Sequence, residues 1–419
     1  MERKPTVPDL VPMHRTELRT SPLNRAVLAA GLGFFVDAFD LFLFNVYRIP
    51  SLMELGLSGA ELREQGERLL ALQMAGMMVG GILTGIVGDR RGRVAVLFGG
   101  IVLYSLCNLA NAVVQDVDTY AAIRFLAGLG LAGELGAGVT LVAESMTAER
   151  RGYGTILVAT LGALGAVCAG LAGDLLPWRT AFAVAGGAGL LLLLFRVRSM
   201  ETGMFQRAKA SAARRGSFTH LFADRRRALR YFACIAMGVP IWFSVGLLIT
   251  LSPELAAEQG VDGWVLTRAF ILFQLGITVG DLGTGVLSQL FRTRRWVIVG
   301  GMLVAIMATV GYFAALRMGI GSYLACFGMG LGCGYLSVFA TTTVEHFGTN
   351  LRVLVAATVT NFMRGSITLL IPFHIWLEQQ FGLSTTVGLV VTGTVVWALA
   401  LTSVLSLPET FGRDLEFVE

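Results

Sequence analysis

Two long apolar segments of the chain are joined by the stretch Gly85-Ile86-Val87-Gly88-Asp89-Arg90-Arg91-Gly92-Arg93. Its glycines allow a sharp reversal of the backbone and a close approach of the two flanking helices. Asp89 can accept hydrogen bonds from the N-terminus of a neighbouring helix and can pair with an arginine. The stretch therefore indicates two antiparallel helices joined by a charged turn that can act as a latch on one conformation.

The composition of the whole chain places most of it in lipid. Of its 419 residues, 55% are hydrophobic and 15% are charged, and the mean hydropathy is +0.70, which excludes a water-soluble globule of this length. A helix needs about 20 apolar residues to cross a hydrocarbon core of roughly 30 Å. We therefore predict an all-α integral membrane protein with twelve transmembrane helices, at 26–48, 68–88, 94–114, 119–143, 152–175, 177–196, 229–251, 265–290, 296–316, 320–343, 353–377 and 383–406.

The sequence also repeats itself. Glu144-x6-Arg151 recurs as Glu345-x6-Arg352, 201 residues later, and the spaced glycines of 128–136 are echoed at 328–334. Membrane proteins built from two similar halves usually bind their ligand between the halves, near the bilayer midplane. We predict an N-terminal tail (1–25), a six-helix bundle (26–196), an arginine-rich linker (197–228), a second bundle (229–406) and a C-terminal tail (407–419).

The positions of the basic residues predict the orientation. With the N-terminus in the cytoplasm, 25 of the 33 Lys and Arg residues lie in cytoplasmic loops and tails or at the adjoining span ends, six lie in the outer loops or near the outer span ends, and two lie deep within spans. Lys and Arg accumulate in short cytoplasmic loops, so we predict N-in and C-in topology in the cell inner (plasma) membrane. The net charge of +5 then reflects topology and contact with the lipid bilayer, and no nucleic-acid surface is expected. We expect a monomer.

The stretch at 85–93 resembles the G-x-x-x-D-R-x-G-R signature loop of the major facilitator superfamily. The E-x6-R-G pattern at Glu144 resembles that of its sugar-porter and metabolite-symporter branches. The resemblance implies two six-helix bundles that rock about a central cavity, with no enzymatic activity. It also implies a cytoplasmic network of charges that favours the outward-facing state, formed by Asp89, Arg90, Arg93, Glu144, Arg151, Glu345 and Arg352.

The second half departs from that pattern. Gln289 stands at the position corresponding to Asp89, so we expect the C-terminal latch to be weaker, although Glu345 and Arg352 remain. The ending Leu407-Pro408-Glu409-Thr410-Phe411-Gly412 resembles the P-E-T-x-G ending of sugar porters, whose acid joins the same network.

Charged residues inside the spans indicate proton coupling. Asp37 and Asp40 lie three residues apart in the first span, and hence on one helical face. Arg124 stands 20 residues before Glu144 and resembles the sugar-porter arginine that pairs with a first-helix aspartate. When an anionic substrate draws Arg124 away, Asp40 loses its cation and can bind a proton. Glu134 resembles a fourth-helix element of proton symporters, with either a relay or a helix-packing role.

The second half supplies the predicted substrate site. Arg364 lies half-way along the eleventh span, where an arginine needs an anionic partner. Two interpretations stay open: Arg364 binds a substrate carboxylate or phosphate, or it forms a permanent ion pair with Asp281 of the eighth span. Further predicted contacts come from Gln274, Asn361 and Trp242.

These residues predict a secondary active transporter that carries a small organic anion with protons by alternating access. The proton is the coupling ion, and no cofactor or resident metal is expected. The surplus of embedded acids leaves an alternative, a proton-coupled exporter of an organic cation or of a divalent metal held by Asp37, Asp40 and Asp281. A non-transporting membrane sensor is a further alternative.

Overall fold

The computed structural model describes residues 25–412, apart from 92, 134–150, 201–217 and 317–319. Most of these residues lie in helices joined by short turns, and no strand occurs among them. The first half contains α1 (Arg25–Glu54), α2 (Gly59–Arg91), α3 (Arg93–Asn111), α4 (Val117–Leu131), α6 (Arg151–Leu175) and α7 (Trp178–Met200). The short α9 (Phe218–Phe222) lies within the predicted linker. The second half contains α10 (Arg225–Phe243), a π-helix η1 (Ser244–Ile249), α11 (Ser252–Glu258), α12 (Leu266–Leu290), α13 (Arg295–Ala315), α14 (Ile320–Cys333), α15 (Leu336–Glu345), α16 (Thr349–Gly365), α17 (Ile367–Phe381) and α18 (Thr385–Ser406).

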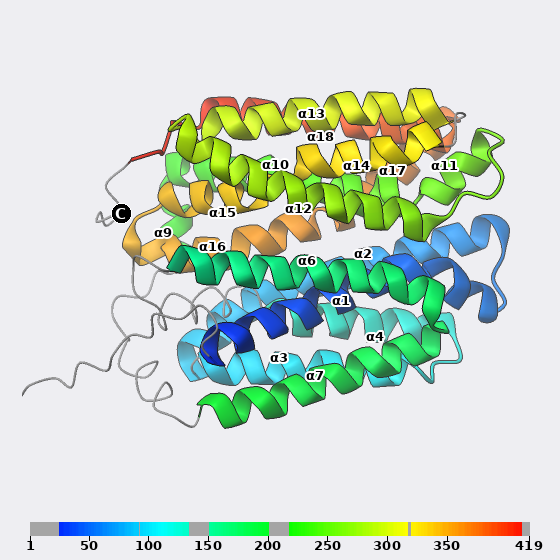
Figure 1. Cartoon of the computed structure of the whole chain (residues 1–419), viewed down its shortest axis with the longest axis horizontal. Coiled ribbons are helices and arrows are strands. Elements are labelled where there is room, and N and C mark those ends of the chain that lie inside the picture. The colour runs from blue at the N-terminus through cyan, green and yellow to red at the C-terminus, as the bar shows by residue number, and fades with distance from the viewer. Residues whose placement is uncertain (1–24, 92, 134–150, 201–217, 317–319, 413–419) are drawn as a thin grey trace, which may run out of the picture.

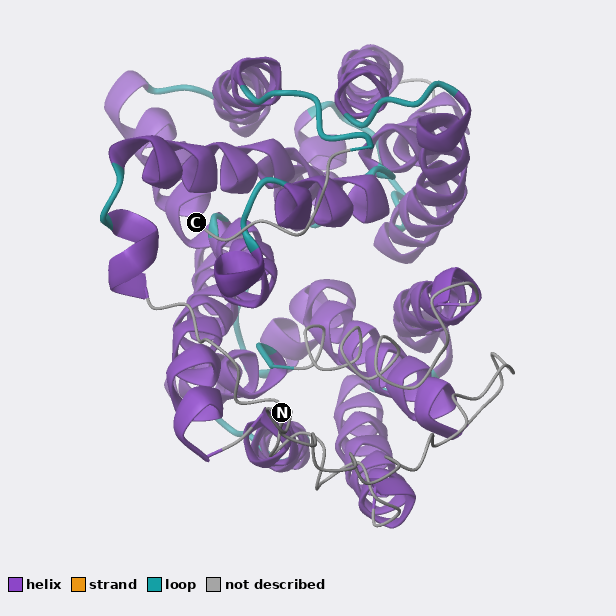
Figure 2. Cartoon of the chain, turned by 90° about the vertical axis from the view of Figure 1, so that its left-hand side faces the viewer, coloured by secondary structure: helices purple, strands orange, loops and turns teal. Residues whose placement is uncertain are grey.

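Each of the twelve predicted spans overlaps one of these helices or a consecutive pair of them. By length and composition, nine spans in the described part of the chain are able to cross a membrane, and a shorter apolar helix covers Leu97–Asn111. The helices run side by side along the long axis of the molecule (Figure 1). Seen from one end, they form two groups (Figure 2).

The two halves pack in the same way at their closest helix contacts. In α4, a Cβ added to Gly128 would lie 2.0 Å from the carbonyl oxygen of Gln73 in α2. In α14, a Cβ added to Gly330 would lie 2.0 Å from the carbonyl oxygen of Phe273 in α12. Glycine is required at both places because any side chain would collide with a backbone. The predicted duplication thus reappears as two matching helix pairs, α2 with α4 and α12 with α14.

Helices of the two groups meet along two lines, α2 against α16 and α17, and α6 against α12. Polar contacts join them at the end of the molecule where α1 ends and α2 begins, which we call the outer end in keeping with the predicted topology. There Asn45 of α1 donates a hydrogen bond of 2.7 Å to the hydroxyl of Thr250. Arg48, also in α1, donates to the carbonyl of Thr250 at 3.0 Å and forms an ion pair with Glu254 of α11.

Three spans of the second half are interrupted near their middle. The seventh passes from α10 into the π-helix η1, the tenth breaks between α14 and α15, and the eleventh breaks between α16 and α17. Discontinuous helices and π-helical turns concentrate at the functional sites of membrane transporters, because they expose backbone groups and redirect side chains. These breaks direct attention to the side chains beside them.

Candidate transport site

A buried acid and a buried arginine face one another inside the first bundle. The carboxylate of Asp40 in α1 lies 4.0 Å from the guanidinium of Arg124 in α4, and both side chains are fully buried. Arg124 is held by the Oδ1 of Asn108, to which it donates a hydrogen bond of 2.9 Å, and it lies 4.8 Å from the ring centre of Phe182. The predicted partners are therefore brought together, with the ion pair at the limit of direct contact.

Arg364 lies at the last turn of α16, beside the break in the eleventh span. Its side chain is 6% exposed, and its guanidinium carbon lies 5.6 Å from the ring centre of Trp242 in α10. Within the described residues the guanidinium forms no ion pair or hydrogen bond, and its Nε has no acceptor. Among the described residues, this buried cation therefore has no directly bonded partner to offset its desolvation.

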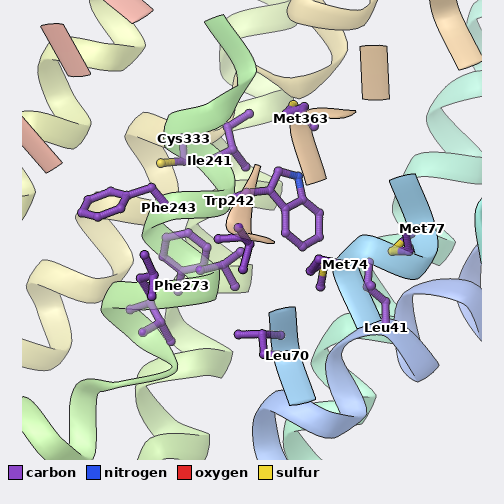
Figure 3. Packing of buried hydrophobic residues seen from close by; sticks show 14 of the residues in the cluster. Leu41, Leu70, Met74, Met77, Ile241, Trp242, Phe243, Phe273, Cys333 and Met363 are labelled. Atoms are coloured by element: carbon purple, nitrogen blue, oxygen red, sulfur yellow. The ribbon is translucent and has the colours of Figure 1, made fainter. Parts of the chain in front are cut away.

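Trp242, the aromatic neighbour of this cation, packs against side chains of both bundles. The ring of Trp242 stacks on Phe42 of α1, with ring centres 5.9 Å apart and planes inclined by 7°. Figure 3 shows Trp242 reaching from α10 toward Met74 of α2, with Met363 beside it. Arg364 thus lies next to a flat apolar wall built by two helices of opposite bundles.

The other predicted contacts fall on both sides of the same interface. Asp37 is fully buried in α1, and its charge acts on Arg364. Asn361 donates to the carbonyl of Ala132, at the end of α4, and to that of Ala357, both at 2.9 Å. Gln274 is buried in α12.

Asp281 does not pair with Arg364, which was one of the two interpretations left open by the sequence. Its carboxylate accepts hydrogen bonds from the backbone N–H of Ser337, at 2.6 Å, and from the Ser337 hydroxyl. These contacts place Asp281 at the N-terminus of α15, where a carboxylate satisfies exposed N–H groups and complements the helix dipole. It secures the break in the tenth span.

The second-half network at the opposite end joins Glu345 to Arg294, at 3.4 Å, and to the hydroxyl of Thr410, at 2.7 Å. Arg352 donates to two backbone carbonyls, those of Val344 and Phe347. Of the remaining predicted residues, Glu134 and Glu144 lie outside the described residues, as do the side chains of Asp89, Arg90, Arg93 and Arg151.

A model of the Major Facilitator Superfamily matches residues 30–372 of the chain. The chain belongs to this superfamily. It is a multi-pass membrane transporter and not an enzyme, as the resemblance of its motifs implied. The predicted fold class is confirmed, whereas the N-in, C-in topology and the domain boundaries stay predictions.

Two curated transporters illustrate the relationship. A probable 4-methylmuconolactone transporter of Cupriavidus pinatubonensis is 26% identical over 398 residues, covering 92% of this chain and 90% of its own. A cis,cis-muconate transport protein of Acinetobacter baylyi is 28% identical over 353 residues, which cover 81% of this chain and 83% of that protein. Among solved structures, a D-xylose-proton symporter superposes with a TM-score of 0.69 at 16% identity, covering 94% of this chain and all of that one. That likeness supports the fold.

The sequence did not reveal the polar cluster around Arg63 at the outer end of this transporter. Arg63 of α2 contacts both His374 and Glu378 of α17, more than 300 positions away in the chain. From the sequence, His374 is a lone histidine near the outer end of a span. The i, i+4 spacing of His374 and Glu378 was a visible signal, but the arginine between them depends on how the two bundles dock.

Proposed function

We propose that this transporter is a proton-coupled symporter of a small organic anion, with a carboxylate as the group recognised. The observation that carries the proposal is Arg364, a buried guanidinium beside a helix break whose positive charge has no hydrogen-bonded partner among the described residues. A carboxylate supplies both the charge and the bidentate acceptors that a guanidinium fits best.

The wall formed by Trp242 and Phe42 favours an anion with a flat ring or an unsaturated chain. The relatives named for muconolactone and muconate agree with this chemistry. The alternative, a metal site at Asp37, Asp40 and Asp281, finds no support, because Asp281 is bonded to Ser337. The described residues also contain no group of three acids, histidines or cysteines placed to hold a metal ion.

Proton coupling follows from the two acids of α1. The charge of Asp37 acts on Arg364 across the interface, so a substrate carboxylate that binds Arg364 replaces the field of Asp37 with its own. Two anions near one cation repel each other, and a proton on the α1 acids removes that cost. Asp40, loosely paired with Arg124, is the proposed resting place of the proton. Substrate and proton then favour each other's binding.

The experiment uses purified protein in liposomes that contain a pH dye. Pools of ring and chain carboxylates, sugars, amines and divalent metals are added outside. We expect a carboxylate pool to acidify the lumen, and Arg364→Gln to abolish this signal. Arg268→Gln, an exposed arginine of α12, is the matched control and should retain it. Uptake of a cation with outward proton flow would instead establish the antiport alternative.

A further inference from the structure

At the outer ends of the two bundles, Arg63 joins the first bundle to α17 and α18 of the second, beside the separate Arg48–Glu254 ion pair between α1 and α11. Arg63 of α2 donates to both carboxylate oxygens of Glu378 in α17, at 2.9 and 2.8 Å, and to the hydroxyl of Thr385 in α18. Its Nε donates to Glu67 on its own helix at 2.8 Å, and its Nη2 lies 3.0 Å from the Nε2 of His374. Figure 1 shows the connections from α1 to α2 and from α17 to α18 at the same end of the molecule.

The contact between Arg63 and His374 fixes the protonation state of the histidine. A guanidinium has five donors and no acceptor, so the Nε2 that faces it must present a lone pair. The imidazole is therefore neutral here, with its hydrogen on Nδ1. That nitrogen faces Gly388 of α18 and has no acceptor among the described residues, and the side chain is fully buried. A proton on Nε2 would place two cations in contact at a site shielded from water.

A protonated His374 has another partner close by. Its Nε2 lies 3.4 Å from Oε1 of Glu378, one turn further along the same helix. Arg63 likewise has Glu67 one turn further along α2. If His374 is charged, each helix can satisfy its own charges through an i, i+4 pair, and the bond between the bundles is no longer needed. If His374 is neutral, separation of the two bundles leaves Glu378 without a cationic partner.

The surrounding charges do not replace either partner. Glu258 of α11 is already engaged by the N–H and hydroxyl of Thr386. Arg48 of α1 acts on Glu67 through its charge but forms its ion pair with Glu254. The titratable groups that face the cluster are thus Arg63 and Glu67 from α2, Glu378 from α17, Glu258 from α11 and Arg48 from α1.

We propose that Arg63, Glu378 and His374 form a proton-operated latch at the outer end of the transporter. With His374 neutral, Glu378 belongs to Arg63 and the outer ends stay closed. With His374 protonated, Glu378 pairs with His374 within α17, Arg63 pairs with Glu67 alone, and the outer ends separate. An acid exterior would then favour the outward-open state, which is the state that loads protons and cargo from outside. The latch rests on alternating access alone and is independent of which cargo Arg364 binds.

The test measures the distance between the outer ends directly, without cargo. Spin labels at Asp118→Cys, in the first bundle, and Gln380→Cys, in the second, sit on exposed positions in a background lacking the five native cysteines. In lipid nanodiscs between pH 8 and pH 4.5, pulsed electron paramagnetic resonance should show a longer-distance population that stays constant above about pH 6.5, the ordinary pKa of histidine, and grows by up to about tenfold per pH unit below it. A distance distribution that does not change with pH would overturn the proposal.

Variants separate the latch from general effects of pH. His374→Gln should remove the pH response, whereas His220→Gln, an exposed histidine of α9, should retain it. Glu378→Gln and Arg63→Gln should populate the longer distance even at pH 8. If His374→Gln shows the same change of distance with pH as wild type, the latch proposal is wrong. Because no transport is measured, failure of this test leaves the anion-symport proposal intact, and the liposome assay can fail without affecting the latch.

Discussion

The Asp40 carboxylate lies 4.0 Å from the guanidinium of Arg124, and neither side chain is exposed. The arginine gives a hydrogen bond of 2.9 Å to Asn108 instead of to the acid. An ion pair of this kind stabilises the charged carboxylate by Coulomb attraction without fixing it through a directional bond. Such a carboxylate can accept a proton without breaking a hydrogen-bond network, as a reversible coupling site requires.

Asp40→Asn should uncouple transport from the proton gradient. The amide keeps the size of the side chain but cannot exchange a proton, so accumulation driven by a pH gradient should fall by at least about tenfold. Exchange of labelled for unlabelled substrate, which needs no net proton movement, should persist. Both are measured in the same liposomes. Asp118→Asn, which alters an exposed acid of α4, is the control and should behave as wild type. Wild-type accumulation by Asp40→Asn would exclude Asp40 as the coupling site.

Asp281→Ala should reduce stability and leave substrate affinity unchanged. The carboxylate binds the backbone N–H and the hydroxyl of Ser337 at the start of α15, and loss of a cap of this type costs about 1–2 kcal/mol. Thermal unfolding in detergent and substrate binding to the same sample distinguish the two effects. Ser337→Ala retains the N–H contact with Asp281, so it should lose less thermal stability than Asp281→Ala. Asp262→Ala, at an exposed position, serves as the control. A large drop in affinity at unchanged melting temperature would return Asp281 to the substrate site.

The features that sequence predicted well are those set by local composition. Apolar length predicted twelve segments that each overlap a helix or a consecutive pair of helices, and the repeat anticipated that glycines of α4 and α14 make matching contacts, because lipid imposes both constraints on each segment separately. The Asp40–Arg124 pair was predicted because Arg124 resembles the sugar-porter arginine that pairs with a first-helix aspartate.

Contacts between the bundles were beyond the reach of the sequence. The partner of Glu378 is Arg63, 315 positions away, and the partner of Arg48 is Glu254, 206 positions away. Asp281 was assigned by depth alone, yet its carboxylate binds Ser337, because the break in the tenth span creates a helix N-terminus that needs an acceptor. Helix breaks leave little trace in hydropathy, so the groups that they expose were not predicted.

Glu409 should stabilise the transporter in a pH-dependent way. Partial burial raises the pKa of this carboxyl, but hydrogen bonds from Thr293 and from the N–H groups of Arg294, Phe411 and Thr410 outweigh it and lower the pKa to about 2. A carboxyl whose pKa is lowered on folding contributes stability above its ordinary pKa of 4.5 and loses it as the pH falls toward 2.

Glu409→Gln should therefore lower the melting temperature by about 2 °C at pH 7. The difference from wild type should shrink steadily below pH 4.5 and disappear near pH 2, as measured by scanning fluorimetry in detergent. Glu61→Gln, which removes an exposed acid from the first turn of α2, should show a smaller difference. If the melting temperature of Glu409→Gln stays equally far below that of wild type at low pH, the charge of Glu409 is not the source of the stability.

Gly128→Ala and Gly330→Ala should destabilise the two halves alike. In each case the new methyl carbon would lie 2.0 Å from a backbone carbonyl oxygen of the neighbouring helix, so the helices must move apart, at a cost of about 1–3 kcal/mol. Gly187→Ala in α7 and Gly300→Ala in α13 are matched controls, because a Cβ at either position meets nothing within 4 Å. There the substitution should be neutral or stabilising by up to about 1 kcal/mol, since alanine favours the helix. Melting temperatures of the four variants in one detergent decide the matter. Equal values for all four would show that the close contacts between α2 and α4 and between α12 and α14 do not limit the packing of either bundle.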